Sequence, residues 1–286
     1  MAVCLGAVGG KRLYETADRS AVYIDPQYPV PLAGAKCVAF SRFTDQPVIV
    51  LLYPTGVIEL LDIHVDSQRI EIDGAKEDLC GVTVLTVAIV EQILAFATSE
   101  NKVVVVSHST PMQQPPTWLL SGNDTVTFLR FTPDRKQLLI GHTSGRVNCV
   151  DIHAGLLSPI EGSHQELVPA AANPKVTDRV VAAARLEAEQ VLVVTADQVQ
   201  LWKPDGRCMS VIAVALPKRI GQARDCVFLK RRMFVLCDEA VWEVKSRRRG
   251  EKAKLTRVDG SVGWCIDVCG LLVWKRGRSE PKRVLI

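Results

Sequence analysis

Cysteine and histidine commonly hold metals, and cysteine can act as a nucleophile, so their spacing in this chain decides whether they could form such a site. The nine cysteines are scattered, and the closest two, Cys265 and Cys269, stand four positions apart. A zinc site needs three or four converging ligands, usually supplied as two close pairs. No second close cysteine pair exists to complete such a set. We therefore interpret the cysteines as core residues of strands and predict neither a metal site nor a cofactor.

Carboxylates bear on acid–base chemistry, and here they recur at similar positions along the chain. The recurring residues are Glu15, Asp18, Asp25, Asp62, Asp151, Asp197 and Asp238. Repetition of this kind is typical of turns and strand ends, whereas catalysis needs two carboxylates at one place. A glycine-rich phosphate loop is also missing. The sequence therefore predicts no catalytic residues and no small-molecule ligand.

Positive charge gathers in the last quarter of the chain. Residues Pro217 to Ile286 hold 18 Lys and Arg against 8 Asp and Glu, whereas the first 216 residues hold 17 against 23. Such a basic region attracts polyanions, and arginine pairs bidentately with phosphate. The candidate contacts for an anion, a nucleic acid or an acidic partner are Lys230, Arg231, Arg232, Arg247, Arg248, Arg249, Lys252, Lys254, Lys275, Arg276 and Arg278.

Three interpretations of this basic region stay open. It binds nucleic acid or another polyanion, it binds an acidic protein, or Ser246 to Lys254 is a solvated loop that serves solubility or nuclear import. The first interpretation predicts steep salt dependence and loss of binding when Arg247, Arg248 and Arg249 are replaced by Ala or Glu.

A second candidate contact is a proline-rich stretch, SHSTPMQQPP, from Ser107 to Pro116. It has three prolines and no apolar periodicity, which predicts an extended surface connection. An ordinary surface loop is the alternative. The candidate docking residues are Pro111, Met112, Pro115, Pro116 and Trp118.

The elements that position these residues follow a repeat. Six times an apolar run stops at a small polar turn, and a second apolar run leaves that turn. The copies span Tyr14–Asp25, Leu51–Asp62, Ala95–Ser107, Leu139–Asp151, Val193–Lys203 and Val235–Lys245. Their turn residues Asp18, Gly56, Asn101, Gly145, Asp197 and Asp238 stand 38, 45, 44, 52 and 41 positions apart. Short strands at a period of roughly 40 to 45 residues are the signature of propeller blades.

The fourth copy, from Thr125 to Ile152, predicts the structure of one unit. Thr132-Pro133-Asp134-Arg135 breaks a strand, because proline lacks the N–H of a ladder and aspartate caps its own turn. Further strands are expected at Leu138–Ile140 and Val147–Ile152, joined by a tight turn at Gly145. A fourth, outer strand is expected near Leu156–Ile160.

This copy resembles the WD-repeat family. The residues that carry the resemblance are Phe131-Thr132-Pro133-Asp134, Gly141-His142 and the closing pair Val150-Asp151. The resemblance implies a β-propeller that mediates protein–protein interactions. It also implies that His142 and Asp151 take part in a buried hydrogen-bond chain that locks adjacent strands, with a contact at the rim as the alternative.

The predicted fold class is therefore all-β, a single β-propeller domain over residues 1–286 with seven four-stranded blades, or six as the alternative. The expected blades are 1–34, 35–76, 77–121, 122–175, 176–221, 222–260 and 261–286. The last blade is short, and a strand from Ala2 to Val8 is expected to complete it. Between Thr177 and Gln190, where a helix is the alternative, a strand is expected at Val180–Ala184.

An odd number of cysteines without a secretory signal predicts reduced thiols in the cytoplasm or nucleus, and no membrane segment is expected. The favoured function is a non-catalytic WD-repeat-like scaffold or accessory subunit of a multi-protein complex. The alternative is an RNA-associated propeller subunit, accessory to an RNA-processing or RNA-modifying enzyme, that uses the basic C-terminal region. A propeller enzyme or a lectin is disfavoured, because aromatic residues are scarce, at 6%.

Overall fold

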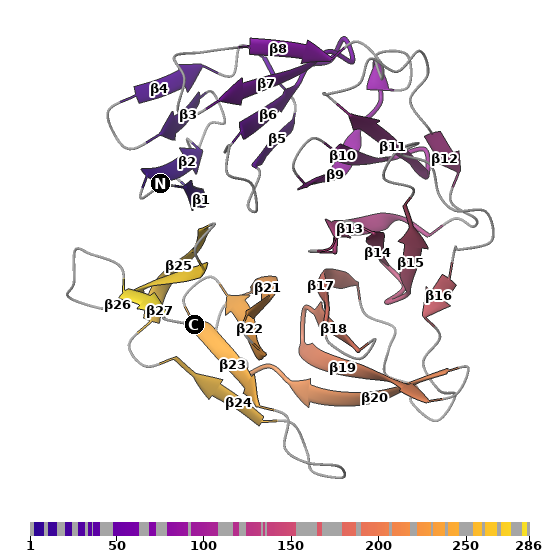
Figure 1. Cartoon of the computed structure of the whole chain (residues 1–286), viewed down its shortest axis with the longest axis vertical. Coiled ribbons are helices and arrows are strands. Elements are labelled where there is room, and N and C mark those ends of the chain that lie inside the picture. The colour runs from indigo at the N-terminus through magenta and orange to yellow at the C-terminus, as the bar shows by residue number, and fades with distance from the viewer. Residues whose placement is uncertain are drawn as a thin grey trace. The chain divides into compact units, whose positions relative to one another are not determined.

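In the computed structural model the chain forms short antiparallel strands (Figure 1). The structure describes residues 3–8, 11–15, 21–24, 28–31, 34–35, 37–40, 48–62, 69–72, 79–90, 93–107, 117–119, 124–132, 134, 136–152, 165–167, 179–186, 190–205, 208–217, 222–229, 231–237, 240–245, 254–258, 261–267, 270–275 and 282–284. Within these residues the strands make seven sheets, six with four strands and one with three. Each strand is paired with the next one in sequence, as in a meander.

The chain divides into two compact units, and the first contains three sheets. Its strands are β1 (Val3–Val8), β2 (Lys11–Glu15), β3 (Ala21–Ile24), β4 (Tyr28–Pro31), β5 (Cys37–Phe40), β6 (Val48–Leu52), β7 (Ile58–Asp62), β8 (Arg69–Ile72), β9 (Val84–Val90), β10 (Ile93–Thr98), β11 (Lys102–Ser107) and β12 (Thr117–Leu119). β1–β4, β5–β8 and β9–β12 each form one sheet. The core of this unit joins the second and third of these sheets, with Phe96, Ile58 and Leu60 buried in one cluster.

The second unit holds the strands β13 to β24 together with β26 and β27. The strands are β13 (Val126–Phe131), β14 (Gln137–His142), β15 (Val147–Asp151), β16 (Gln165–Leu167), β17 (Val180–Arg185), β18 (Val191–Thr195), β19 (Gln198–Asp205), β20 (Cys208–Ala215), β21 (Ala223–Leu229), β22 (Arg232–Cys237), β23 (Val241–Lys245), β24 (Lys254–Arg257), β26 (Gly270–Lys275) and β27 (Lys282–Val284). A last strand, β25 (Ser261–Asp267), precedes β26 in the seventh sheet.

The sequence contains continuous apolar runs, and three of them form the second strands of the fourth, fifth and sixth sheets. β14, β18 and β22 are buried at nearly every position, so both faces of these strands are covered. One apolar cluster extends over these three sheets and includes Leu139, Trp202 and Val235. The first strands β13, β17 and β21 lie next to one another within this unit (Figure 1).

Tight turns follow the predicted chemistry. Gly56, Asn101 and Gly145 have φ values of 81°, 58° and 87°, the left-handed region that glycine and asparagine tolerate best. At the turn after β13 an Asp134 carboxylate oxygen accepts hydrogen bonds from the Thr132 hydroxyl at 2.5 Å and the Lys136 amide at 3.2 Å. The predicted aspartate cap is therefore present.

The structure differs from the prediction at two strands, and it shows that one ambiguous segment is a strand. The N-terminal strand does not complete the last sheet, because β1 pairs with β2 in the first sheet, with Val8 opposite Lys11 across a two-residue connection. The outer strand of the fourth sheet is Gln165–Leu167, paired with β15, whereas the predicted position near 156–160 lies outside the described residues. β17 confirms the strand that was expected from Val180.

Candidate functional site

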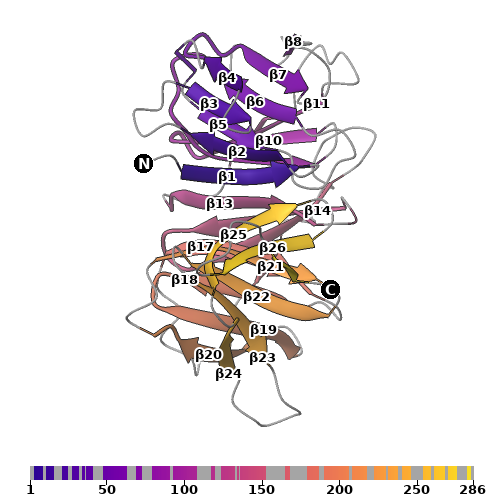
Figure 2. The ribbon, with the colours of Figure 1, turned by 90° about the vertical axis from the view of Figure 1, so that its left-hand side faces the viewer.

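In the sixth sheet, Arg232 begins β22, Lys245 ends β23 and Lys254 begins β24 (Figures 1 and 2). Side chains alternate between the two faces of a strand. On β23, Val244 belongs to the apolar core cluster and Trp242 packs against it. Glu243 and Lys245 alternate with these residues, so they lie on the opposite face of the sheet.

Arg232 is bound to the protein's own atoms on this second face. Its Nε donates a hydrogen bond of 2.9 Å to Oε1 of Glu243, and its guanidinium carbon lies 5.0 Å from the centre of the Phe234 ring. The hydrogen bond to Glu243 raises the pKa of Arg232. The same bond is the main reason that the pKa of Glu243 lies below its ordinary value. Arg232 therefore has a partner within its own sheet, and its role as a partner contact stays a prediction.

Lys245 and Lys254 stand directly opposite each other on the paired strands β23 and β24. Both are exposed, and the Lys245 side chain keeps 55% of its surface accessible. The Lys245 ammonium lies 3.7 Å from Oε2 of Glu243, the carboxylate that Arg232 also uses. Like charges at opposing positions destabilise a sheet. This end of the β23–β24 hairpin thus holds two ammonium groups, and the carboxylate beside Lys245 also binds Arg232.

The other predicted basic contacts are only partly described. Arg231 is exposed at the turn between β21 and β22, where its φ of 63° is left-handed. Lys275 ends β26, and its side chain lies outside the described part. Outside the described residues lie Lys230, Arg247, Arg248, Arg249, Lys252, Arg276 and Arg278.

The predicted docking strip is described at one residue. Trp118 is the middle residue of β12, paired with Val103 of β11, and its side chain lies outside the described part. Outside the described residues lie Pro111, Met112, Pro115 and Pro116.

A buried charge cluster that the sequence did not predict joins the first strands of three sheets. Arg130 on β13 donates from Nη1 to the carbonyl oxygens of Ala183 on β17, at 3.0 Å, and Cys226 on β21, at 2.7 Å. Its Nη2 donates to Oδ1 of Asp225, which also accepts the Cys226 amide at 2.8 Å. Arg130 also lies over the Phe128 ring, 5.0 Å from its centre. One guanidinium thus connects three sheets.

The pKa values in this cluster indicate a structural role for its residues and not a catalytic one. Burial alone would lower the pKa of Arg130, but the neighbouring Asp225 carboxylate raises it above its ordinary value. Burial raises the pKa of Cys226 to about 12. A thiol with such a pKa stays protonated at neutral pH and is not a nucleophile.

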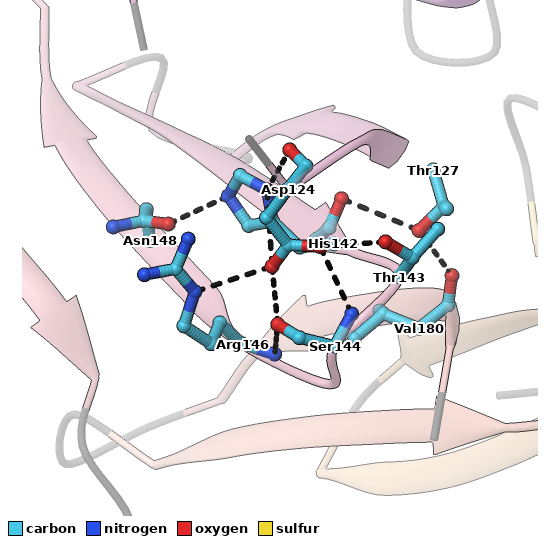
Figure 3. Close-up of polar contacts among 9 residues, drawn as sticks. Asp124, Thr127, His142, Thr143, Ser144, Arg146, Asn148 and Val180 are labelled. Carbon is cyan, nitrogen blue, oxygen red and sulfur yellow. Dashed lines mark hydrogen bonds and ion pairs between the residues drawn. The ribbon is translucent and has the colours of Figure 1, made fainter. Parts of the chain in front are cut away.

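A second polar cluster locks the turn between β14 and β15 (Figure 3). His142 is buried, its Nε2 lies 2.7 Å from Oδ1 of Asn148, and its Nδ1 lies 3.2 Å from the carbonyl oxygen of Asp124. The buried position supports the hydrogen-bond role expected of His142 over the alternative of a rim contact. The expected second member, Asp151, instead accepts a hydrogen bond of 2.6 Å from Gln137 on the neighbouring strand.

Asp124 is the centre of this cluster, and no sequence pattern had singled it out. Its carboxylate accepts hydrogen bonds from Thr143 Oγ1 at 2.5 Å, from the Ser144 amide at 3.1 Å and from Arg146 Nε at 3.2 Å, together with one from the Ser144 hydroxyl (Figure 3). Burial by itself raises the pKa of Asp124, but these hydrogen bonds outweigh it and leave the pKa below its ordinary value.

The buried ionisable groups of the described chain therefore already have partners within the protein. The described residues contain no group of three or more histidine, cysteine or acidic side chains that could hold a metal. Among the described cysteines, Cys149, Cys226 and Cys237 are buried, Cys80 is exposed, and none of these four forms a disulfide. Within the described residues no helix has the length and hydropathy that crossing a membrane requires.

Comparison with known proteins identifies the fold. The chain is similar to a chain in the crystal structure of the mitotic checkpoint complex, with a TM-score of 0.61 and 13% identity over 100% of this chain and 87% of that one. It is similar to the β-propeller domain of Cps50 (Swd1) from Myceliophteria thermophila, with a TM-score of 0.56 and 14% identity over 88% and 86% of the two chains.

Hsv2 from Kluyveromyces lactis is similar as well, with a TM-score of 0.56 and 9% identity over 86% of this chain and 81% of that one. No family model and no curated protein sequence matches the chain. The likenesses show a β-propeller fold, so the predicted all-β propeller class is confirmed.

Proposed function

We propose that the chain is a non-catalytic propeller subunit that holds protein partners together in a larger complex. The observation that carries this proposal is the use of the buried ionisable groups. In the described residues Arg130, Asp225 and His142 all form hydrogen bonds within the protein, so these groups make the fold rigid. A rigid framework that presents its loops and sheet edges is what a scaffold requires.

The arrangement of the sheets supports the same proposal. We propose that the seven sheets are seven blades of one propeller domain over residues 1–286, because each sheet is built from consecutive strands. Repeated blades leave only short, protected edges and offer broad surfaces to partners. The similar chain in the mitotic checkpoint complex belongs to a multi-protein assembly, which supports a role of this kind.

An affinity purification from the native cell tests the proposal. The tagged chain is recovered with and without nuclease, at low and at high salt, and the co-purified proteins are quantified by mass spectrometry. A scaffold keeps a fixed, stoichiometric set of proteins under all four conditions. A chain recovered alone under all four conditions would overturn the proposal.

A matched variant separates this test from any binding through the basic residues of β23 and β24. Lys245→Gln with Lys254→Gln removes two exposed charges and touches no buried group. If the chain is a scaffold, this variant recovers the same set of proteins at high salt. Partners that are lost with these two lysines bind through the sixth sheet, and partners that remain bind elsewhere on the chain.

A further inference from the structure

The fourth strand of the fifth sheet, β20, is longer than the fourth strands of the other sheets. It has eight residues, whereas β4, β8, β12, β16 and β24 have three or four each in the described part of the chain. Among the described strands, each of these six is paired with a single neighbour, so all of them lie at the edge of a sheet. A long edge strand is a template on which another strand can pair.

Proteins protect sheet edges with short strands, charged side chains, prolines and bulges. The other fourth strands carry such features, since β8, β16 and β24 contain charged residues, β4 contains prolines and β12 has only three residues. The sequence of β20, CMSVIAVA, contains no charged residue and no proline. Its eight residues pair with β19 in one continuous register, from Asp205 opposite Cys208 to Gln198 opposite Ala215, without a bulge. β20 therefore has none of these four protections.

The segment from Ile212 to Ala215 shows what this edge offers to a second strand. Ile212 and Val214 are half-buried and pack against the apolar core cluster of their unit, whereas Ala213 and Ala215 are exposed. β19 pairs with one edge of this segment, and no described strand pairs with its other edge. Because an alanine side chain is small, it leaves the N–H and C=O groups of this edge accessible to another backbone.

The sequence of this segment is complementary to a second copy of itself. Two identical antiparallel strands are related by a two-fold axis perpendicular to the sheet, which places each residue opposite one from the same face. With the axis at Ala213, Ile212 lies opposite Val214 of the second copy, and Ala213 lies opposite the same alanine. β-Branched residues are good cross-strand neighbours, and this pairing brings no like charges together. A second copy of β20 is therefore the occupant that fits this edge.

We propose that the chain forms a two-fold symmetric dimer in which the β20 strands of two copies pair as antiparallel neighbours, with the axis at Ala213. Backbone hydrogen bonds hold the two copies together, and the pairing of Ile212 with Val214 fixes the register. Each chain has one β20, and the pairing uses the open edge of both copies, so the assembly stops at two chains. The dimer goes beyond the scaffold function and does not depend on it.

Sedimentation equilibrium measures the dimer directly. The wild type is expected to have twice the mass of one chain at high concentration and to dissociate on dilution. Ala213→Lys places two ammonium groups at the axis, so it should raise the dissociation constant about tenfold or more. The matched control Thr55→Lys adds the same charge at an exposed position between β6 and β7, and it should leave the dissociation constant unchanged. Circular dichroism shows that each variant is folded.

Cysteine cross-linking tests the register of the two strands. The test variant is Ala213→Cys, and the matched control is Ala215→Cys, which places the thiol at the other exposed alanine of β20. In the proposed pairing the two thiols of the test variant face each other across the axis, at a Cα separation that a disulfide spans. Those of the control lie about 13 Å apart along the strands, because each is two residues from the axis.

Mild oxidation is therefore expected to cross-link Ala213→Cys at several times the yield of Ala215→Cys. The wild type, oxidised in parallel, gives the background from the chain's own cysteines, of which Cys80 is exposed.

Three results would overturn the proposal. A wild type that sediments as a monomer at every concentration leaves the edge of β20 to a strand of a different protein. A dimer whose dissociation constant is the same in Ala213→Lys and Thr55→Lys is formed by another surface. Equal cross-linking of Ala213→Cys and Ala215→Cys excludes a register with its axis at Ala213. None of these results bears on the set of proteins that a scaffold retains at high salt.

Discussion

Charged residues have opposite surroundings in two regions of the molecule. The first region comprises the first strands of the fourth, fifth and sixth sheets. The second region is the outer hairpin of the sixth sheet, formed by β23 and β24. On the first strands, Arg130 is held by Asp225 and by two backbone carbonyl oxygens. On the outer hairpin, Lys245 faces Lys254, and the carboxylate beside Lys245 is shared with Arg232. The first region satisfies its charges within the chain, whereas the second brings like charges together at the surface.

This difference separates the residues that build the fold from those that are free to meet a partner. A buried charge that loses its partner is strongly destabilising, so the inner cluster tolerates little change. An exposed like-charge pair adds no stability, and a structural role does not account for it. In the described part of the basic region, Arg232 pairs with Glu243, whereas Lys254 faces another lysine.

The largest effect is expected for Arg130→Ala. The change leaves the Asp225 carboxylate buried without its counter-charge and frees the carbonyl oxygens of Ala183 and Cys226. We expect the free energy of unfolding to fall by about 3–5 kcal/mol, measured by urea denaturation. The matched double variant Arg130→Met with Asp225→Leu removes both charges and should recover most of that loss. A loss below about 1 kcal/mol for Arg130→Ala would show that the inner cluster does not hold the sheets together.

The next effect concerns Asp124→Asn, which removes the charge at the centre of the second cluster. We expect a loss of about 1.5–3 kcal/mol at neutral pH, because hydrogen bonds to a charged acceptor are replaced by weaker ones. The pKa of Asp124 in the folded chain lies below its ordinary value of 3.8. Its stabilisation is therefore complete above pH 3.8 and is lost as the pH falls through the folded-state pKa.

The difference between the wild type and Asp124→Asn should accordingly shrink below pH 3.8 in a series of urea denaturations. A difference that stays constant down to pH 2 or so would contradict a role of the ionised carboxylate.

Gly141→Ala tests the packing between the fourth and fifth sheets. A Cβ at this position would lie 2.6 Å from Cγ1 and 2.9 Å from Cβ of Val180. Because valine is stiff at χ1, it cannot move aside without a backbone shift. We expect a loss of about 1–3 kcal/mol in the free energy of unfolding. An unchanged melting temperature would mean that the two sheets are packed less closely than the structure shows.

Turns and buried strands depend on local sequence patterns, and these features were predicted from the sequence. Turn chemistry at Gly56 and Asn101 fixed where hairpins form, and the apolar runs between such turns became the buried strands β10, β14 and β22. The short strand β16 was misplaced, because its three residues carry no alternation that separates them from a loop. The pairing of β1 was missed because either edge of a sheet can accept a terminal strand.

The sequence could not predict contacts that depend on how sheets stack. Arg130 and Asp225 are 95 positions apart and meet because β13 and β21 are both first strands of their sheets. The available signal was an arginine inside the apolar strand β13 and an aspartate, next to Arg224, in β21. For the basic region, the amount of charge follows from composition alone. Only the pairing of strands shows that Arg232 has a carboxylate partner and that Lys254 faces another lysine.

The smallest expected effect tests the central claim, that the charges of the outer hairpin do not hold the fold together. The measurement is the free energy of unfolding of Lys245→Gln with Lys254→Gln, compared with the wild type by urea denaturation at low salt. Removal of the like-charge pair should leave the protein as stable as before or more stable by about 0.2–1 kcal/mol. A loss of more than about 1 kcal/mol would contradict the claim, because the two lysines would then belong with Arg130 among the charges that build the fold.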